Sequence, residues 1–576
     1  MTNSMSRPKK IRISNNKKRK VNELVQQANA AFAGHHFDTC EIICRQIDAI
    51  VPELSNIANL RGSMAASQGH YNTALNFFEK ALKSAPDNLD FLNNIARLYA
   101  MIGRPKASQK YYEDAIKAQK TSSLRLKARM ESCKAMLEHF QQPETAIEML
   151  IGILNAYPNN IEARILLSTA YSSLQRYSDA LNAVISKHPN CTEAHHQIGM
   201  ILSQVGDFEA AIKSFRTALQ YTPKHAGSYS AIATIKKFKH RDDADIISMQ
   251  QLKNQLPDRS LDAEILSFAM GKAWDDIRDV DKAFASFEEG NQTRSQRTPY
   301  FLDAELDNLQ HTMGCFSTQV CKQDSGVNDC MPIFIVGMPR CGSTLTEQIL
   351  AAHHLVFARG EEGAMGNVAL ARQHSDEQPF TIERIASFST AQWSQVGADY
   401  LEAVKPERPC ERITDKSLNN IRLLGAIHAA LPQAKIIHVR RHPLDTCWSI
   451  YKHNLEGEMF GYGAKLEALG RYYKMYQRLM EHWREVLPEG VMLEINYEEL
   501  VADQEKATHK LLKFCDLEWD ENCLQFHKLR NQVSTASVAQ VRRPIYKGSV
   551  MAWQRYEQHL QPLIKILGTD GWESTL

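Results

Sequence analysis

The sequence predicts an all-α helical repeat array followed by an α/β domain with a parallel sheet. Over residues 21–295, helical segments follow one another with a period near 34 residues, which is typical of stacked repeats. Residues 296–330 lose this period and carry mixed polar content, so we predict a linker there. Over residues 331–576, short apolar runs alternate with helical segments, as in the crossovers that build parallel sheets.

The first segment, residues 1–20, contains eight Lys or Arg residues and no acidic residue. A segment of this composition buries too little apolar surface to offset the entropy lost on ordering, so we predict a basic disordered tail. Its charge leaves open an arm that binds nucleic acid or a membrane surface, or an import-like patch.

Small residues and prolines recur at fixed spacings within the predicted array. Ala81 and Ala115 are 34 residues apart, and a Gly-x-aromatic-x-x-Ala motif starts at Gly69 and again at Gly206. In both copies a proline follows the alanine of the motif by twelve residues. This pattern resembles tetratricopeptide repeats, of which we count six to eight. The resemblance implies a tetratricopeptide-like solenoid with a concave surface that binds a peptide or protein. A scaffold or a dimerisation arm, and hence a homodimer, is the alternative.

The second domain opens with a motif that favours an anion. Ile333–Val336 is an apolar run typical of a buried strand, and a loop from Gly337 to Gly342 leads into a predicted helix. The first turn of a helix has unpaired N–H groups and a positive dipole end, and glycine lets backbone amides approach a phosphate closely. The sequence therefore predicts an anion site at this turn.

The glycine spacing in this loop matches a nucleotide-binding P-loop, but the cation is displaced. A P-loop requires Lys after its last glycine, whereas Ser343 and Thr344 stand there and the cation is Arg340, upstream. This favours a loop that holds phosphate or sulfate through amides, two hydroxyls and a guanidinium. The rival interpretation is a P-loop kinase or nucleoside triphosphatase, which would bind ATP and Mg²⁺.

The letters PRCGSTL after an apolar strand resemble the 5′-phosphosulfate-binding loop of sulfotransferases that use 3′-phosphoadenosine 5′-phosphosulfate (PAPS). Arginine before Cys-Gly-Ser-Thr is most similar to the tyrosylprotein sulfotransferase branch. The resemblance implies a P-loop-like sulfotransferase domain in which Arg340 contacts the sulfuryl group and the bridging oxygen. It also implies that the loop amides and two hydroxyls cradle the 5′-phosphate, through Cys341, Gly342, Ser343 and Thr344.

A second strand and helix supply another pair of polar residues. The apolar run at residues 435–439 is followed by Arg441 and, eight positions later, by Ser449. Ligands of open α/β sheets bind at strand ends of this kind, where a guanidinium and a hydroxyl suit a phosphate monoester. The same pair at the same spacing resembles the 3′-phosphate-binding motif of PAPS sulfotransferases. An ordinary surface ion pair is the alternative.

Further resemblances lie toward the C-terminus. Lys547 and Gly548, with a tryptophan five residues after the glycine, are similar to the family's late Lys-Gly segment over the 3′-phosphate. The family often has glycine where this chain has Met551. Tyr497 matches a tyrosine that contacts the nucleotide in the tyrosylprotein branch, and Ser537 resembles the catalytic serine of that branch.

Two more catalytic roles are implied by the same resemblance. Lys416 matches a lysine at the leaving oxygen, with a surface lysine at a helix start as the alternative. Glu361, in RGEEG, resembles the family's catalytic base, and a carboxylate serves a hydroxyl best when burial raises its pKa. The neighbouring Glu362 is an alternative base, as are His353 and His354, which otherwise cap the end of the loop helix.

Composition narrows the class of partners and the compartment. The formal net charge of +2 argues against bulk binding to nucleic acid. No run approaches the roughly 18 apolar residues that span a bilayer, and no apolar signal-peptide core stands near the start. The twelve cysteines are scattered without a C-x-x-C pair, so we expect reduced thiols, no zinc site and a cytoplasmic protein.

Together these features indicate an enzyme that transfers a sulfuryl group from PAPS to an acceptor hydroxyl and releases adenosine 3′,5′-bisphosphate (PAP). Positioning and electrostatics carry most of the rate in the related phosphoryl transfers. Because cations can hold the charge of the leaving phosphate, we expect no metal. The repeat array favours a peptide or protein acceptor. A third interpretation is a non-catalytic repeat scaffold with a vestigial PAPS site.

Overall fold

The computed structural model describes residues 14–33, 37–68, 70–102, 104–138, 142–174, 176–185, 191–257, 259–298, 300–321, 326–329, 331–361, 363–373, 381–406, 408–455, 457–529, 538–546 and 548–568. The chain forms two compact units, Met1–Gln142 and Pro143–Leu576, which are treated separately below.

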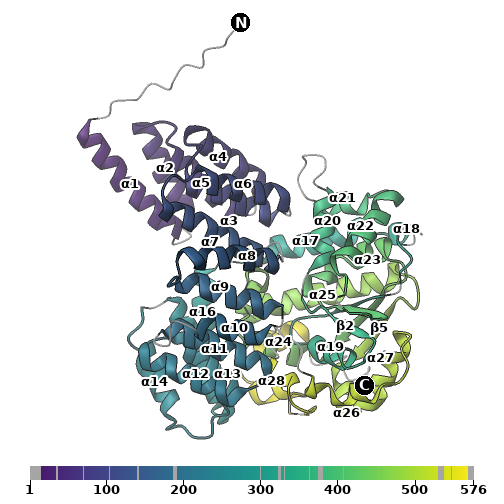
Figure 1. Ribbon diagram of the computed structural model, residues 1–576. Coiled ribbons are helices and arrows are strands. Elements are labelled where there is room, and N and C mark those ends of the chain that lie inside the picture. The colour runs from purple at the N-terminus through teal and green to yellow at the C-terminus, as the bar shows by residue number, and fades with distance from the viewer. Residues whose placement is uncertain are drawn as a thin grey trace. The chain divides into compact units, whose positions relative to one another are not determined.

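The first unit is a stack of paired helices (Figure 1). They are α1 (Asn15–Ala33), α2 (Phe37–Ile50), α3 (Ser55–Ser67), α4 (Tyr71–Ser84), α5 (Leu89–Met101), α6 (Pro105–Ala118) and α7 (Ser122–Glu138). Gly62 of α3 faces Phe78 of α4, and a Cβ on this glycine would lie 2.5 Å from the ring. The absent side chain therefore lets the two helices of a pair approach closely.

Helix α1 starts inside the segment predicted to be a disordered tail. Its first residue is Asn15, and residues 1–13 lie outside the described residues. Val21, Ala28 and Ala31 of α1 are buried in one apolar cluster with residues of α2 and α3. The prediction of disorder is thus wrong from residue 15 onward, because α1 buries an apolar face. The basic residues of its first turns dominate the composition, so composition did not indicate that face.

The second unit begins with more helical pairs. They are α8 (Pro143–Ala156), α9 (Ile161–Ser173), α10 (Tyr177–Ile185), α11 (Thr192–Val205), α12 (Phe208–Tyr221), α13 (Ala226–Ile235), α14 (Ala244–Lys253), α15 (Leu261–Asp276) and α16 (Val280–Arg297). The close approach of Gly62 and Phe78 recurs here at Gly199 with Phe215 and at Gly271 with Phe287, each with 2.5 Å from a Cβ to the ring. Each glycine precedes its phenylalanine by sixteen residues. The predicted all-α repeat array is confirmed.

A five-stranded sheet forms the centre of the C-terminal half. Its strands are β1 (Pro332–Val336), β2 (Val356–Ala358), β3 (Arg412–Asp415), β4 (Lys435–Arg440) and β5 (Met492–Asn496). Their order is β2-β3-β1-β4-β5, and every pairing is parallel. This confirms the predicted α/β domain. Strand β1 lies in the middle, so the carboxyl ends of β1, β4 and β5 open at one edge of the sheet.

The remaining elements surround this sheet. They are α17 (Leu302–Cys315), α18 (Thr318–Cys321), α19 (Ser343–Ala351), α20 (Ala364–Gln373), α21 (Ile382–Ala386), α22 (Thr390–Ala403), η2 (Leu418–Arg422), α23 (Leu424–Ala430), α24 (Pro443–Tyr451), η3 (Glu458–Ala464), α25 (Leu466–Val486), α26 (Tyr497–Ala502), α27 (Gln504–Phe514), η4 (Glu521–Lys528), α28 (Val538–Val541), η5 (Ala552–Tyr556) and α29 (Gln561–Leu567).

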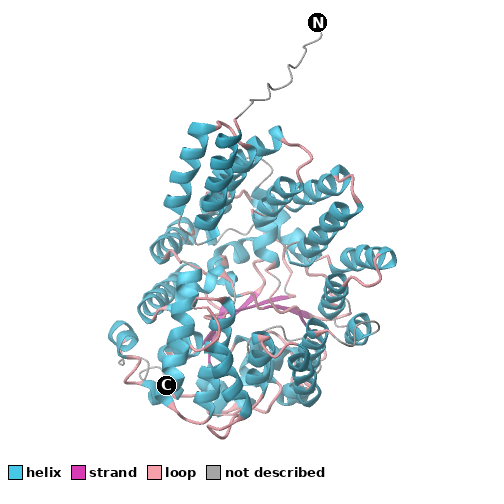
Figure 2. Ribbon diagram, turned by 90° about the vertical axis from the view of Figure 1, so that its left-hand side faces the viewer, coloured by secondary structure: helices cyan, strands magenta, loops and turns pink. Residues whose placement is uncertain are grey.

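Helices cover both faces of the sheet (Figure 2). Successive side chains of a strand point to opposite faces, and β1 divides accordingly between two cores. Phe334 and Val336 belong to the core that holds residues of α22, α23 and α25. Ile333 and Ile335 belong to the core that holds residues of α19 and α27. Burial on both faces explains why β1 is apolar at every position.

The last helical pair of the array packs directly on the sheet domain. The ring of Phe284 in α16 stacks on Trp448 at 6.1 Å and on His559 at 4.4 Å. The amide of Asn291 donates a 2.8 Å hydrogen bond to the backbone oxygen of Tyr451. These contacts join α16 to α24, a helix that also borders the candidate site.

The segment predicted as a linker is largely helical. Residues 302–321 form α17 and α18, in which Leu309, Thr312 and Cys321 are buried. Leu309 and Cys321 belong to the same core as α25, so this segment is part of the sheet domain rather than a connector. Most of its polar residues face outward, which is why composition alone suggests a linker. Among the described helices, none is both long and apolar enough to cross a membrane.

Candidate active site

The loop after β1 has the geometry of an anion cradle. Gly342 has φ 107° and is the N-cap of α19, whose first turn therefore has no capping side chain. A Cβ on Gly342 would lie 2.6 Å from the ring of Tyr497. Arg340 also has a positive φ, of 68°, a conformation that costs an L-residue roughly 1 kcal/mol or more. The loop thus brings a guanidinium close to the positive end of a helix.

Arg340 is held by side chains from two other segments. Its Nε donates to the hydroxyl of Ser449 at 3.2 Å, and its Nη2 donates to Oε1 of Gln540 at 3.0 Å. The same Nη2 lies 3.3 Å from Nε2 of His453. Burial, together with the nearby charge of Arg441, lowers the pKa of Arg340 to about 10. The guanidinium of Arg340 remains charged at neutral pH. A bound anion would relieve the repulsion between the charges of Arg340 and Arg441.

Arg441 joins the ends of β1 and β4 to the C-terminal segment. Its Nη1 donates to the backbone oxygen of Arg340 at 3.0 Å, and its Nη2 donates to the backbone oxygen of Ser549 at 2.6 Å. Its guanidinium lies over the ring of Tyr497, 4.8 Å from the ring centre. Only 8% of Arg441 is exposed, and within the described residues its buried Nε has no partner. A buried, unpaired donor on a cation fits an anionic ligand.

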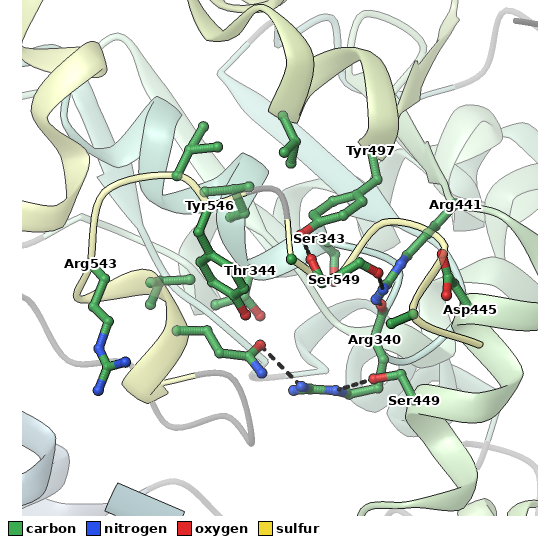
Figure 3. Close-up of a pocket in the computed structure, with 18 of the residues that line it drawn as sticks. Arg340, Ser343, Thr344, Arg441, Asp445, Ser449, Tyr497, Arg543, Tyr546 and Ser549 are labelled. Atoms are coloured by element: carbon green, nitrogen blue, oxygen red, sulfur yellow. Dashed lines mark hydrogen bonds between the residues drawn. The ribbon is translucent and has the colours of Figure 1, made fainter. Parts of the chain in front are cut away.

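These side chains surround a cavity of about 180 Å³ (Figure 3). Eight of the predicted site residues line it, namely Arg340, Gly342, Ser343, Thr344, Arg441, Ser449, Tyr497 and Gly548. Cys341 does not line the cavity, and its amide donates to the backbone oxygen of Met338 at 3.2 Å. Its side chain is buried, which raises the pKa of the thiol to about 11. The cavity thus holds two clusters of anion-binding groups, one at the start of α19 and one at α24.

Several lining residues were not expected from the sequence. His453 lies four positions after Ser449, and its Nδ1 donates a hydrogen bond to the backbone oxygen of Ser449 at 2.6 Å. Asp445, 1% exposed, accepts hydrogen bonds from the backbone N–H groups of Met551 and Trp553 at 2.6 and 2.9 Å. The helical spacing of His453 was a usable signal. No pattern in the sequence indicated the role of Asp445, because the loop that it holds lies more than a hundred residues away along the chain.

Glu361 and Lys416 form an ion pair with each other and do not line this cavity. Lys416 is fully buried, whereas 39% of the Glu361 side chain is exposed. Beside them lies the buried Glu347 of α19, which accepts from the Thr414 hydroxyl at 3.0 Å and from the Gly360 amide at 3.1 Å. Burial raises the pKa of Glu347, and the charge of Lys416 opposes that rise. Sequence reasoning overlooked Glu347.

Of the remaining predicted residues, three lie outside the described part of the chain and one is held by backbone contacts. Ser537, Lys547 and Glu362 lie outside the described residues. His353 is buried with its Nε2 3.0 Å from the Glu518 backbone oxygen, and it accepts at Nδ1 from the Leu355 amide at 3.2 Å. The ring of His353 is therefore committed to backbone contacts at the end of α19. This geometry favours the capping role over that of a base.

Family models match parts of both the repeat array and the sheet domain. Residues 332–521 match the model of the sulfotransferase family, and residues 65–130 and 192–225 match models of tetratricopeptide repeats. The chain joins tetratricopeptide repeats to a sulfotransferase domain. The resemblance stated from the sequence is thereby confirmed, and the loop of Arg340 and the segment of Arg441 both lie within the matched sulfotransferase region.

Two curated relatives and one solved structure illustrate the similarity. An uncharacterized protein of Aquifex aeolicus (strain VF5) is 29% identical over 404 residues, 68% of this chain and 52% of that protein. A protein-tyrosine sulfotransferase of Drosophila melanogaster is 22% identical over 259 residues, 42% of this chain and 52% of that protein. The chain thus spans about half the length of these two relatives. The sulfotransferase domain from the curacin biosynthetic pathway is 17% identical with a TM-score of 0.27, and the match covers 41% of this chain and 98% of that domain.

Proposed function

We propose that this sulfotransferase takes a sulfuryl group from PAPS and transfers it to a hydroxyl on a peptide or protein. The observation that carries the proposal is the cavity between α19 and α24. In it, the loop of Arg340 provides one anion-binding group, and Arg441 and Ser449 provide an adjacent one. A donor with charged groups at both its 5′ and 3′ positions matches two such groups better than a nucleoside triphosphate does.

The residues present fit PAPS at both ends. At the 5′ end, the uncapped first turn of α19 offers amides and the buried hydroxyls of Ser343 and Thr344, a combination that suits phosphate. At the 3′ end, Arg441 has a buried Nε without a partner among the described residues. The hydroxyl of Ser449 faces the same cavity. Tyr497, which packs against both Gly342 and Arg441, spans the two ends.

Arg340 is placed to act in the transfer itself. Its guanidinium is fixed by Ser449 and Gln540, so it needs little reorganisation when negative charge develops on the bridging oxygen. The acceptor hydroxyl must lose a proton, and we assign that step to the carboxylate of Glu361. In this structure Lys416 holds Glu361. The hydroxyl of a bound acceptor would have to displace Lys416 from the carboxylate of Glu361. Lys416 would then donate a hydrogen bond to the leaving oxygen.

The repeat array supports a peptide or protein as the acceptor. Stacked helical pairs build extended concave surfaces, and the last pair packs on α24 beside the cavity through Phe284 and Asn291. The backbone oxygen of Gln204 in α11 accepts a 3.3 Å hydrogen bond from Arg542, one residue before the lining residue Arg543. A chain bound along residues 191–297 would therefore lie close to the site of transfer.

The first test is thermal unfolding of the full chain with PAP, and separately with ATP and Mg²⁺. A ligand at about a hundred times its dissociation constant stabilises the folded state by roughly 2.7 kcal/mol. We expect the transition to rise by several degrees with PAP alone. A rise only with ATP and Mg²⁺ would favour a P-loop kinase or nucleoside triphosphatase instead. No rise with either ligand would indicate a vestigial site. Labelled PAPS with a library of hydroxyl-bearing peptides then tests transfer.

A further inference from the structure

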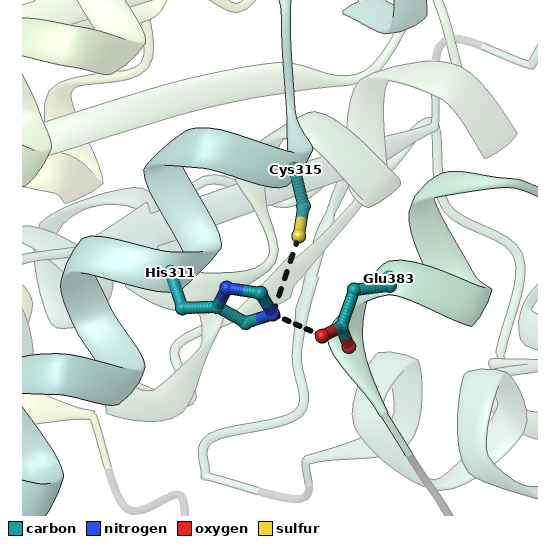
Figure 4. A group of neighbouring side chains, drawn as sticks. All are labelled: His311, Cys315 and Glu383. Atoms are coloured by element: carbon teal, nitrogen blue, oxygen red, sulfur yellow. Dashed lines mark hydrogen bonds and ion pairs between the residues drawn. The ribbon is translucent and has the colours of Figure 1, made fainter.

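A second group of polar side chains lies away from the cavity, where α17 meets α21. His311 and Cys315 are four residues apart on α17, and Glu383 stands in the first turn of α21. One nitrogen of the His311 ring points toward both the thiol and the carboxylate (Figure 4). Its Nε2 contacts Oε1 of Glu383 and lies 3.7 Å from Sγ of Cys315. None of the three residues lines the cavity described above.

The three donor atoms lie close enough together to ligate one metal ion once the carboxylate turns away from the imidazole. All of them lie within 4.8 Å of one another. Tetrahedral zinc, with Zn–S near 2.3 Å and Zn–N near 2.0–2.1 Å, places sulfur and nitrogen about 3.6 Å apart. The distance of 3.7 Å between Sγ of Cys315 and Nε2 of His311 is already close to this value. A thiolate, an imidazole and a carboxylate are also the donor types that zinc takes, whereas magnesium and calcium prefer oxygen alone.

The surroundings allow a metal to enter and the ligands to adjust. The side chains of His311 and Glu383 are 50% and 52% exposed, so the carboxylate can turn from the imidazole toward an ion. Helical spacing of four residues keeps His311 and Cys315 on one face of α17 whether or not Glu383 moves. The fourth position of a tetrahedral ion would face solvent.

We propose that His311, Cys315 and Glu383 bind a Zn²⁺ ion that cross-links α17 and α21. The ion would link the helix that follows the repeat array to a helix on the outer face of the sheet domain. This departs from the sequence-based expectation of no zinc site. That expectation rested on the absence of a C-x-x-C pair. Such a criterion does not detect a site with a single cysteine, whose ligands come from segments about seventy residues apart.

Metal binding is the direct test, and it does not depend on the proposed activity. The full chain is stripped with a chelator, and Zn²⁺ is titrated in competition with a chromophoric chelator. We expect one zinc per chain in the site, and a rise in the melting temperature when it fills. Replacement by Co²⁺ should give the intense visible bands of a tetrahedral site and a thiolate-to-cobalt band. Loss of that thiolate band in Cys315→Ser assigns the sulfur ligand.

Three variants and two controls decide the assignment. Cys315→Ser, His311→Ala and Glu383→Gln should each weaken zinc binding by about a hundredfold or more, because each removes one of only three protein ligands. His354→Ala changes another histidine beside an aspartate, and Cys191→Ser changes another part-exposed cysteine. Both controls should bind zinc as the unchanged chain does. If Cys315→Ser fails to fold, the half-exposed Glu383→Gln carries the test.

Two results would overturn the proposal. One is a chain that takes up less than one equivalent of zinc at micromolar concentration. The other is equal affinity in the three variants and the unchanged chain, or loss of zinc in His354→Ala instead, which would place any bound ion elsewhere. The PAP-induced rise in melting temperature should persist in all three variants. It reports separately on the nucleotide site, so failure of one proposal is distinguishable from failure of the other.

Discussion

Arg441 donates a 3.0 Å hydrogen bond from its guanidinium to the backbone oxygen of Arg340. The two arginines thus lie together at the carboxyl ends of adjacent parallel strands, one after β1 and the other after β4. Like charges this close repel each other unless an anion lies between or beside them. The charges that line the cavity therefore favour a ligand that carries negative charge.

Replacing Arg441 should weaken nucleotide binding. Loss of one partner from a buried, charge-paired contact costs roughly 2–5 kcal/mol, so Arg441→Ala should lower the affinity for PAP by about 30-fold to several thousand-fold. Isothermal titration with PAP measures this. Arg440→Ala is the matched control, since the neighbouring Arg440 pairs with Glu494 and does not line the cavity. Unchanged PAP affinity in Arg441→Ala would reject its assignment to the 3′-phosphate.

Replacing Glu361 should separate catalysis from binding. Glu361→Gln keeps the shape of the side chain but removes the base, so turnover with labelled PAPS should fall by about 100-fold or more. PAP affinity should stay within about twofold, because Glu361 lies outside the cavity lining. Glu402→Gln, an exposed carboxylate on α22, is the control. Full turnover in Glu361→Gln would move the base elsewhere, and the buried Glu347 is then the next carboxylate to replace.

The two anion-binding groups could be predicted because local sequence specifies them. A strand, a glycine-bounded loop and a helix start place Arg340, Ser343 and Thr344 without reference to the rest of the chain. Arg441 and Ser449 are fixed in the same way by β4 and α24. Their convergence on one cavity follows from the parallel order of β1 and β4, which alternating strands and helices also predict.

Other features depend on contacts between distant segments, which a single sequence does not display. Gln540 reaches Arg340 across two hundred residues. Lys416 pairs with Glu361, fifty-five residues away, and neither residue lines the cavity. The helices α17 and α18 escaped prediction because few of their residues are buried. The sixteen-residue glycine–phenylalanine spacing was visible in the sequence, but only the packing shows its meaning.

The third prediction concerns Gly342. A Cβ there would meet the Tyr497 ring at 2.6 Å, in a backbone conformation that already disfavours a side chain. Gly342→Ala should therefore destabilise the protein by about 2 kcal/mol or more and also weaken PAP binding. Gly490→Ala is a close control, because Gly490 has a φ of 83° but nothing within 4 Å of a Cβ. If thermal melts and PAP titrations show equal effects for both, steric contact with Tyr497 is not what requires glycine.

A fourth prediction concerns the junction between the array and the sulfotransferase domain. Asp275 of α15 pairs with Lys452 and Arg555, both of which line the cavity, at 3.2 Å each. It also accepts a 2.8 Å hydrogen bond from Tyr556. Asp275→Ala leaves these cations without their carboxylate and should lower stability by roughly 3 kcal/mol. Thermal melts measure the loss, and the exposed Asp262→Ala on the same helix should melt like the unchanged chain.

The same substitution should not weaken nucleotide binding, although it lowers stability. Without Asp275, Lys452 and Arg555 leave more positive charge beside the cavity. PAP affinity should therefore rise or stay level while the melting temperature falls, and its salt dependence should steepen. Parallel loss of stability and of PAP affinity would instead mean that Asp275 only maintains the shape of the site.

The last prediction is a pH dependence that originates at Glu494 of β5. Burial alone would raise the pKa of this carboxyl, but the hydrogen bond with His438 and the charges of Arg484 and Arg440 outweigh burial and lower it to about 2. Since the folded pKa lies below the unfolded value near 4.3, Glu494 stabilises the fold above that value. The contribution disappears as the pH falls from about 4.3 to about 2.

Glu494→Gln tests this sign directly. At pH 7 the variant should be less stable than the unchanged chain by on the order of 2 kcal/mol, allowing for partial exposure to solvent. The difference should shrink toward zero near pH 2, where the carboxyl is protonated in both the folded and the unfolded chain. Denaturant unfolding at a series of pH values measures the difference, with the exposed Glu489→Gln as control. A difference that stays constant between pH 7 and the acid limit would mean that packing, rather than the charge of Glu494, accounts for the loss.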